Sequence, residues 1–396
     1  MMPLKITLII TIFGDDGDLH QLLTQVKKQE LIPDEVIIIN SLREVDIHNI
    51  IKKFSDYLNI RYFFKDTRLM PGAARNFGVQ QSSYPLIAFL DSKTLPNKEW
   101  LCSALKDWNG SKRSIVFGST SYIAHTEFQK IVILSTYGKN AASSIPGTLI
   151  TQELFKEIGF FSENVRAGED IEWRNRAYGH DNVIIIIPKN STLIYDSVST
   201  NIFSELYRSA RNNWSAASID AQLNTRALFL ALVSSFLLLI TPNWNRFLGG
   251  IFFIPNITKI YFIFFSISVI LVYLIRPKKI RVLIQNLFLP MLFTFLILTI
   301  AFPEALQMAA THTIGEKFLI SIGPFFITSL LTIGFIFRAF IAPIRLGANL
   351  NDLFPLRWIL MGSLGLVNDL FKAPGYLLGA CLTVGRIFKR KIYDSF

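Results

Sequence analysis

The sequence predicts an α/β domain followed by an α-helical transmembrane domain. Of the 396 residues, 51% are hydrophobic and only 17% are charged, which is too apolar for one soluble domain. The excess of apolar residues lies almost entirely after Arg226. Before Arg226, charged and apolar residues alternate as in a globular domain, so we expect a soluble first half and a membrane-bound second half.

Short apolar runs alternate with amphipathic helical patterns in the first half, which predicts a parallel sheet with helices on both faces, in a Rossmann-like order. The expected strands are Leu4–Phe13, Glu35–Asn40, Ile60–Phe64, Leu86–Asp91 and Ile115–Phe117. The expected helices lie near Leu19–Lys28, Ile47–Tyr57, Gly72–Gln81 and Lys98–Trp108. Ligands of such sheets bind beyond the carboxyl ends of the strands, where Asp91 and the turn Thr11–Asp16 lie.

The first apolar segment, Leu4–Phe13, is expected to be a strand rather than a signal peptide. Gly14, Asp15 and Asp16 end it, and no small-residue cleavage site follows. We therefore expect the first domain to stay in the cytosol. The two cysteines, Cys102 and Cys381, lie in different regions, so no disulfide is expected.

The formal net charge is +11, yet the basic residues do not form one run with interleaved aromatic residues. The pattern therefore does not indicate a nucleic-acid partner. Several basic residues flank hydrophobic segments, as in Arg276–Arg281 and Arg386–Lys391. Anionic membrane phospholipid and phosphorylated substrates are the expected partners.

Three short motifs follow one another in the first half: GAARNFG at Gly72–Gly78, FLDSKTLP at Phe89–Pro96 and AGEDIEW at Ala167–Trp173. Their order and separation resemble family 2 glycosyltransferases over roughly the first half of the chain. The run from Pro146 to Asp170 is the most specific part of the resemblance. It implies a Rossmann-like GT-A nucleotide-sugar domain, which moves a sugar from a nucleotide diphosphate to an acceptor.

The helix that starts at Gly72 opens with small residues, so a phosphate could approach its N-terminus closely. A tightly packed helix with Arg75 on the surface is the alternative interpretation. The family resemblance, with the strand ends, implies a set of donor-binding residues. They are Thr11, Asn40, Arg75, Asn76, Asp91 and Lys93.

The family usually carries Asp-x-Asp at the strand end that Asp91 occupies, and these acids hold a divalent cation, Mg²⁺ or Mn²⁺, against the donor diphosphate. Here Lys93 replaces the second acid. Its ammonium group cannot bind a metal but can contact diphosphate oxygens. The resemblance thus implies Asp91 as a ribose or metal contact, and a catalytically inactive nucleotide-sugar binding or scaffold protein stays open as an alternative.

Glu169 and Asp170 follow Gly168, a pattern that by itself indicates a helix N-terminus where the dipole favours acids. The resemblance implies that Asp170 is the catalytic base for an acceptor hydroxyl and that Glu169 positions acceptor or donor. With a polyprenyl phosphate as acceptor, whose oxygen is already ionised, Asp170 would only position it. His125 and His180 have no second ligand at metal-site spacing, so we expect surface histidines.

The sequence as a whole predicts four consecutive regions. Residues 1–200 form the GT-A domain, 201–225 an amphipathic interfacial helix, 226–345 about four transmembrane helices, and 346–396 interfacial or re-entrant helices with a basic tail. The amphipathic helix could equally pack under the catalytic domain. The expected spans are Ala227–Thr241, Ile257–Ile275, Val282–Phe302 and Phe318–Phe337. Asn368, Asp369, Lys372 and Pro374 interrupt the last apolar stretch, Trp358–Leu382, so a fifth span is not expected there.

Together these features predict a multi-pass protein of a bacterial-type inner membrane with a cytosolic catalytic domain. We expect an inverting glycosyltransferase that adds a sugar to a lipid-linked acceptor in envelope polysaccharide or glycolipid synthesis. The pattern also leaves open a polyprenyl-phosphate monosaccharide transferase and, from a different class, a transporter.

Overall fold

The computed structural model describes residues 5–12, 16–41, 47–219, 221–222, 225 and 331–393. The chain divides into two compact units, of which the first comprises residues 1–221, 335–375 and 389–396. The second comprises residues 222–334 and 376–388. The candidate site lies in the first unit.

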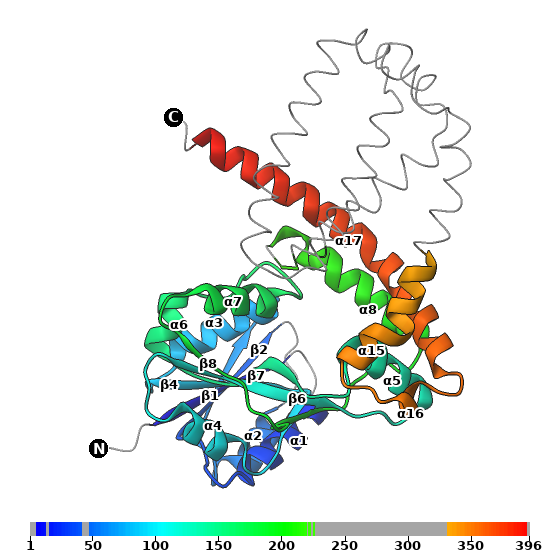
Figure 1. Ribbon diagram of the computed structural model, residues 1–396. Coiled ribbons are helices and arrows are strands. Elements are labelled where there is room, and N and C mark those ends of the chain that lie inside the picture. Colours follow the sequence, from blue (N-terminus) through cyan, green and yellow to red (C-terminus); the bar gives the residue numbers. More distant parts are fainter. Residues whose placement is uncertain are drawn as a thin grey trace, which may run out of the picture. The chain divides into compact units, whose positions relative to one another are not determined.

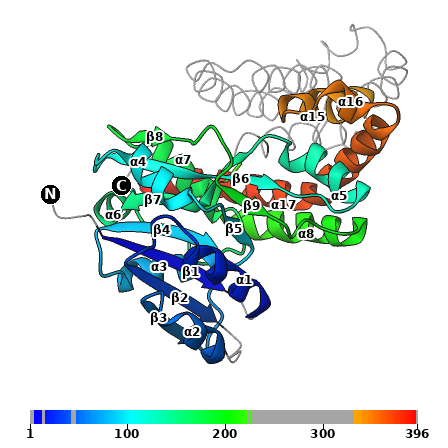
Figure 2. The same ribbon diagram turned by 90° about the horizontal axis from the view of Figure 1, so that it is seen from below.

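A mixed β-sheet forms the centre of the first unit. Over the described residues its strands are β1 (Ile6–Ile12), β2 (Glu35–Ser41), β3 (Ile60–Lys65), β4 (Leu86–Asp91), β5 (Thr94–Pro96), β6 (Ser114–Tyr122), β7 (Ala142–Thr151), β8 (Ile184–Ile186) and β9 (Leu193–Tyr195). The strand order is β3-β2-β1-β4-β7-β6-β9-β5, with β8 beside β6, and Figure 2 shows β3, β2, β1 and β4 in sequence. The first four strands are parallel, as predicted. The prediction of an entirely parallel sheet is wrong, because β7 runs antiparallel to β4 and β6, and hydrophobic periodicity carries no information about strand direction.

Helices cover both faces of the sheet. Figure 1 shows α1 (Asp16–Lys27), α2 (His48–Phe54) and α4 (Trp100–Trp108) on one face, and α3 (Pro71–Gln81), α6 (Gln152–Ile158) and α7 (Glu169–Gly179) on the other. Each face of the sheet has its own hydrophobic core. Leu8 and Ile10 of β1 belong to one of these cores, and Ile9 belongs to the other. Two buried faces explain why the strands read as continuous apolar runs, and the prediction of helices on both faces is confirmed.

A third core joins segments that are far apart in the sequence. It packs α5 (Glu127–Val132) and the π-helical turn η1 (Ile133–Tyr137) against residues 348–364. The C-terminal elements are η3 (Phe337–Ile341), α15 (Ala342–Arg345), α16 (Leu350–Leu353) and α17 (Arg357–Tyr393). Lys139 and Asp352 form an ion pair of 2.8 Å across this contact. The domain boundary at residue 200 stays a prediction, but residues 335–375 belong to the same compact unit as the first 221.

The predicted spans Ala227–Thr241, Ile257–Ile275 and Val282–Phe302 lie outside the described residues, as does most of Phe318–Phe337. Within the part of the chain that the structure describes, no helix has the length and apolar character needed to cross a membrane. The polar residues that interrupt the apolar stretch Trp358–Leu382 lie within one helix, because α17 continues through Pro374. One polar side chain of that stretch, Asp369, accepts a hydrogen bond of 2.6 Å from Arg338, so it is accommodated without ending the helix.

The amino ends of β1, β2 and β3 are tied together by a buried carboxylate. Glu35 is 2% exposed and accepts hydrogen bonds from Thr7 (2.7 Å), Arg61 (2.7 Å) and Ser83 (2.8 Å from Oγ, 3.0 Å from the backbone N–H). Burial alone would raise the pKa of Glu35, but these hydrogen bonds together hold the pKa below its ordinary value of 4.5. This edge of the sheet lies opposite the strand ends that form the candidate site.

We expect Glu35→Gln to lower the free energy of unfolding at neutral pH by about 1–3 kcal/mol, because the buried carboxylate that accepts hydrogen bonds from Thr7, Arg61 and Ser83 is lost. The folded state binds fewer protons here than the unfolded chain, so this stabilisation is present above pH ~4.5 and is lost as pH falls through the folded pKa. Chemical denaturation across this pH range measures the difference. The exposed Glu99→Gln serves as control, and a wild-type-to-Glu35→Gln difference that stays constant with pH would contradict the assignment.

Candidate active site

The candidate site begins where the strand order of the sheet reverses. From β1 the chain continues to β2 and β3 on one side and returns to β4 on the other side. Thr11 and Asp91 are register partners at the carboxyl ends of β1 and β4, and the Thr11 hydroxyl donates a hydrogen bond of 3.3 Å to Asp91 Oδ1. Ligands of open α/β sheets bind in the crevice at such a reversal, so the structure brings these two predicted residues together where the fold favours binding.

Arg75 on α3 connects the two ends of the site. Its Nη2 donates to Asp91 Oδ1 (2.9 Å) and Oδ2 (3.2 Å), and its Nη1 donates to Glu169 Oε1 (2.8 Å). Arg75 is only 5% exposed, so the alternative that placed it on the surface is wrong. One turn earlier, Gly72 lets α3 pack closely against the backbone at Ser162. A Cβ at this position would lie 2.3 Å from the Ser162 carbonyl oxygen.

Arg75 and its two acid partners, Asp91 and Glu169, affect one another's pKa. Burial would lower the pKa of Arg75, but the charges of Asp91 and Glu169 raise it above its ordinary value, so the guanidinium stays charged. For Glu169, burial raises the pKa more than Arg75 lowers it, and the neighbouring Asp170 raises it further. The second oxygen of Glu169, Oε2, is buried and accepts no hydrogen bond from another described residue. Glu169 is therefore held in place by Arg75.

Asp170 differs from Glu169 although the two are adjacent. The N-cap of α7 is Gly168, at φ 93°, a left-handed conformation that favours glycine. Successive helical residues point about 100° apart, so Glu169 is buried against Arg75 whereas Asp170 is half-buried. Among the described residues Asp170 forms no hydrogen bond or ion pair. Of the two adjacent acids, only Glu169 is paired with Arg75.

Asn76 has a structural role that the sequence did not reveal. Its Nδ2 donates to Phe161 O (2.9 Å) and to Glu163 Oε1 (2.9 Å), and its Oδ1 accepts from the Phe161 backbone N–H (2.9 Å). Both amide hydrogens are thus used inside the protein, and Asn76 is 1% exposed. The geometry gives no support to the predicted donor contact of Asn76, which instead fixes the loop that leads to α7.

Asn40 and Lys93 lie on either side of the crevice. Asn40 is the penultimate residue of β2, next to β1. It is fully buried and donates a hydrogen bond of 3.3 Å to the Tyr62 hydroxyl. Lys93 follows β4, is about half exposed, and places its Nζ 3.8 Å from Oδ2 of Asp18 on α1. Lys93 therefore reaches from the end of β4 towards the helix that follows β1. The carboxylate of Asp18 went unnoticed in the sequence because it belongs to no motif.

Two partly buried tyrosines, Tyr122 and Tyr195, interact electrostatically with the acids of the site. Burial raises the pKa of Tyr122 and of Tyr195, and the charges of Asp170 and Asp91, respectively, raise it further. Their rings are 5.6 Å apart. Tyr195 lies on β9, a strand of three residues whose alternation is too short to recognise in the sequence.

Arg166, in the loop before α7, contributes positive charge to the site. Burial lowers the pKa of Arg166, as do the charges of Arg211 and Arg68, whereas Glu169 and Asp91 raise it. Basic groups from three separate segments thus act on one another beside the two acids. Such a concentration of positive charge favours an anionic ligand. The spacing of these arginines in the sequence carries no signal, because only the fold brings them together.

His125 and His180 each lie beside a partly exposed carboxylate. His125 pairs with Asp196 at the surface, and His180 Nε2 lies 3.7 Å from Glu157 Oε1.

Residues 7–168 match the family model of glycosyl transferase family 2. These residues form a family 2 glycosyltransferase domain. The family assignment suggested by the three motifs is thereby confirmed, and the match contains Thr11, Arg75, Asp91 and Gly168.

The glycosyltransferase domain is similar to several named proteins. It is 22% identical over 184 residues to glycosyltransferase AglE of Haloferax volcanii, which covers 43% of this chain and 60% of that protein. It is 32% identical over 91 residues to the UDP-Gal:alpha-D-GlcNAc-diphosphoundecaprenol beta-1,3-galactosyltransferase of Escherichia coli, covering 22% of this chain and 33% of that protein. A crystal structure of S. aureus TarS 1–349 with UDP-GlcNAc is 17% identical, covers 58% of this chain and 72% of that one, and has a TM-score of 0.40. The chain spans less than two thirds of the length of these two curated relatives.

Proposed function

We propose that this protein is a membrane-bound inverting glycosyltransferase that moves a sugar from a nucleotide-diphosphate donor to a lipid-linked acceptor. One observation carries the proposal: the buried guanidinium of Arg75 joins Asp91 to Glu169. The donor end of the crevice at β4 and the acceptor end at α7 are thereby one site. A structural ion pair alone would not need to lie at the reversal of the strand order, next to an available carboxylate.

In the proposed reaction, Asp170 takes the proton from an acceptor hydroxyl as that oxygen attacks the anomeric carbon. The bond from the anomeric carbon to the diphosphate breaks on the opposite face, which inverts the anomeric configuration. The nucleoside diphosphate leaves with the electron pair, and Lys93 and the arginines around the crevice stabilise its charge. Glu169, held by Arg75, keeps the first turn of α7 in position.

A lipid-linked acceptor is supported by apolar side chains that the first unit exposes. Helix α8 (Ile202–Ser215) buries Leu206 but exposes an aromatic stripe of Phe203 (80%), Tyr207 (67%) and Trp214 (59%). The buried residue and the exposed stripe indicate a helix that both packs on its own unit and presents an apolar face. Exposed aromatic and apolar stripes on a helix are typical of membrane interfaces.

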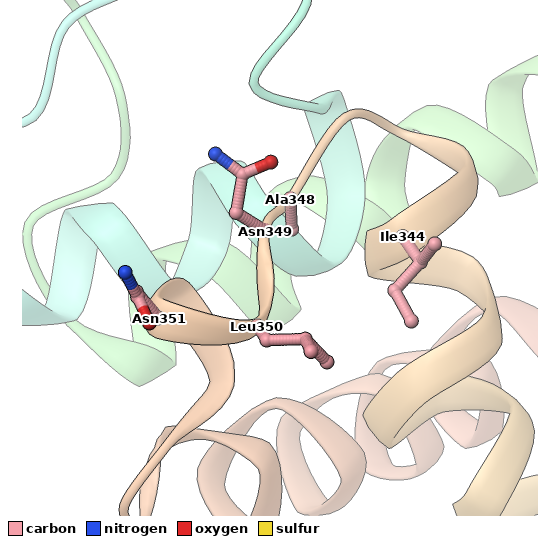
Figure 3. Close-up of a pocket in the computed structure, with 5 residues that line it drawn as sticks. All are labelled: Ile344, Ala348, Asn349, Leu350 and Asn351. Atoms are coloured by element: carbon pink, nitrogen blue, oxygen red, sulfur yellow. The ribbon is translucent and has the colours of Figure 1, made fainter.

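A second apolar surface lies around α16. Leu350, Phe354, Leu356 and Leu360 are each at least half exposed. Figure 3 shows Ile344 of α15 and Leu350 of α16 on either side of a surface hollow. Both surfaces would suit contact with a bilayer, and the Escherichia coli relative is named for an acceptor linked to diphosphoundecaprenol. An inner-membrane location, a cytosolic catalytic domain and a part in envelope polysaccharide or glycolipid synthesis complete the proposal.

Transfer assays on the full-length protein test this function. The protein is extracted from washed membranes with detergent and given a panel of labelled UDP-, GDP- and TDP-sugars. The acceptors are a sugar linked to polyprenyl diphosphate, bare polyprenyl phosphate and a soluble oligosaccharide. We expect product with the diphosphate-linked sugar and, by NMR, an inverted anomeric centre.

A retained anomeric configuration, or no transfer from any donor, would contradict the proposal. Product with bare polyprenyl phosphate alone would instead identify a polyprenyl-phosphate monosaccharide transferase. Recovery of the protein only in the aqueous fraction would contradict the proposed membrane location. The proposed transfer reaction would still be tested by its product.

A further inference from the structure

The family implies a divalent cation between the donor diphosphate and the acids of an Asp-x-Asp motif, and the residues at this strand end do not fit one. Both oxygens of Asp91 accept hydrogen bonds from Arg75, and Oδ1 also accepts one from Thr11. The position of the second acid holds Lys93. In the described part of the chain, no three His, Cys, Asp or Glu side chains are grouped as a metal site. A divalent cation at Asp91 would lie against the guanidinium group of Arg75.

We propose that this crevice binds the diphosphate of its donor without a divalent cation, using Lys93 as the mobile counter-charge. This inference rests on the proposed function, because it assumes a nucleoside-diphosphate donor. It assigns the part of the cation to two side chains of the chain itself. Arg75, which pairs with both Asp91 and Glu169, offsets part of the negative charge of Asp91 that would otherwise repel the diphosphate. Lys93 contacts the diphosphate directly.

The geometry of Lys93 suits this part. In this structure its Nζ is 3.8 Å from Asp18 Oδ2, a long ion pair whose side chains are 47% and 32% exposed. Such a contact contributes little stability and can be exchanged for phosphate oxygens at little cost. Arg75, by contrast, is buried with two acid partners and is not free to move. The fixed cation and the mobile one therefore have separate tasks.

Calorimetric titration of the full-length protein with UDP, GDP and TDP tests the inference. Each titration is done once in excess EDTA and once with added Mn²⁺. For whichever nucleotide binds, we expect the same affinity in both conditions. Lys93→Ala should weaken binding about 10- to 100-fold, the effect of losing a charged hydrogen bond. Lys93→Asp should weaken binding further, because it reverses the charge.

Lys98→Ala is the matched control. Lys98 also forms a long ion pair, 3.7 Å to Glu30, and its side chain is exposed, so its removal should leave nucleotide affinity unchanged. Wild-type binding that requires Mn²⁺, or wild-type affinity in both Lys93 variants, would overturn the metal-free site while leaving the proposed function intact. No binding of any of the three nucleotides in either condition would overturn the proposed function itself.

Discussion

Replacing Arg75 with methionine is expected to lower the free energy of unfolding by about 3–5 kcal/mol, because it leaves the buried carboxylate of Glu169 without its cation. Transfer activity should be lost as well, since Asp91 and the first turn of α7 are no longer held together. Arg75→Lys should not rescue activity, because one ammonium group cannot reproduce the fork that reaches both acids. Chemical denaturation and donor hydrolysis measure the two effects.

Adding Glu169→Gln to Arg75→Met separates the cost of an unpaired buried charge from the cost of lost packing. The double variant Arg75→Met, Glu169→Gln removes the uncompensated charge and should recover part of the stability without recovering transfer. Arg113→Met is the matched control, because Arg113 pairs with Glu157 at the surface and its loss should change stability little. An Arg75→Met protein as stable as the wild type would show that the bridge does not hold the site together.

Asp170→Asn is expected to reduce transfer to an acceptor hydroxyl by about 10²- to 10⁴-fold, the usual contribution of a general base. Nucleoside-diphosphate affinity should stay near that of the wild type, because Asp170 forms no hydrogen bond or ion pair with the rest of the described chain. Single-turnover transfer and calorimetry, done on the same preparation, separate the two quantities. Asp181→Asn, at an exposed position just after α7, is the control.

The expected loss of transfer activity in Asp170→Asn depends on the acceptor. With polyprenyl phosphate, whose oxygen is already ionised, the loss on Asp170→Asn should be much smaller than with a hydroxyl acceptor. Full transfer to a hydroxyl acceptor by the variant would remove Asp170 as the base. In that case Glu169 would still be a poor replacement, since its carboxylate is bound to Arg75.

The first four strands and their helices were predictable because each carries a strong local signal. The apolar runs of β1, β2, β3 and β4 are continuous because both faces of the sheet are covered, and the helices between them show clear periodicity. The antiparallel strand β7 and the short strands β5, β8 and β9 were not predicted as such. Their pairing partners are distant in the sequence, and three residues are too few to show a period.

The same limit applies to the site residues. Asp91, Glu169 and Asp170 could be recognised because motifs surround them, whereas Asp18 and Tyr195 belong to no motif. Asn76 carried a motif signal, yet its amide is satisfied by the loop at Phe161 and Glu163. A motif records which residue type stands at a position, and the direction of its side chain depends on what packs around it.

By itself the sequence determined the Rossmann-like beginning of the chain, the family of its first domain and the replacement of an acid by Lys93. All three are local properties, written in runs of neighbouring residues. Only the tertiary structure decided that Arg75 is buried between Asp91 and Glu169, which stand 78 positions apart in the numbering. The physical reason is that an ion pair depends on distance in space, and the folding of the sheet and α7 creates that proximity.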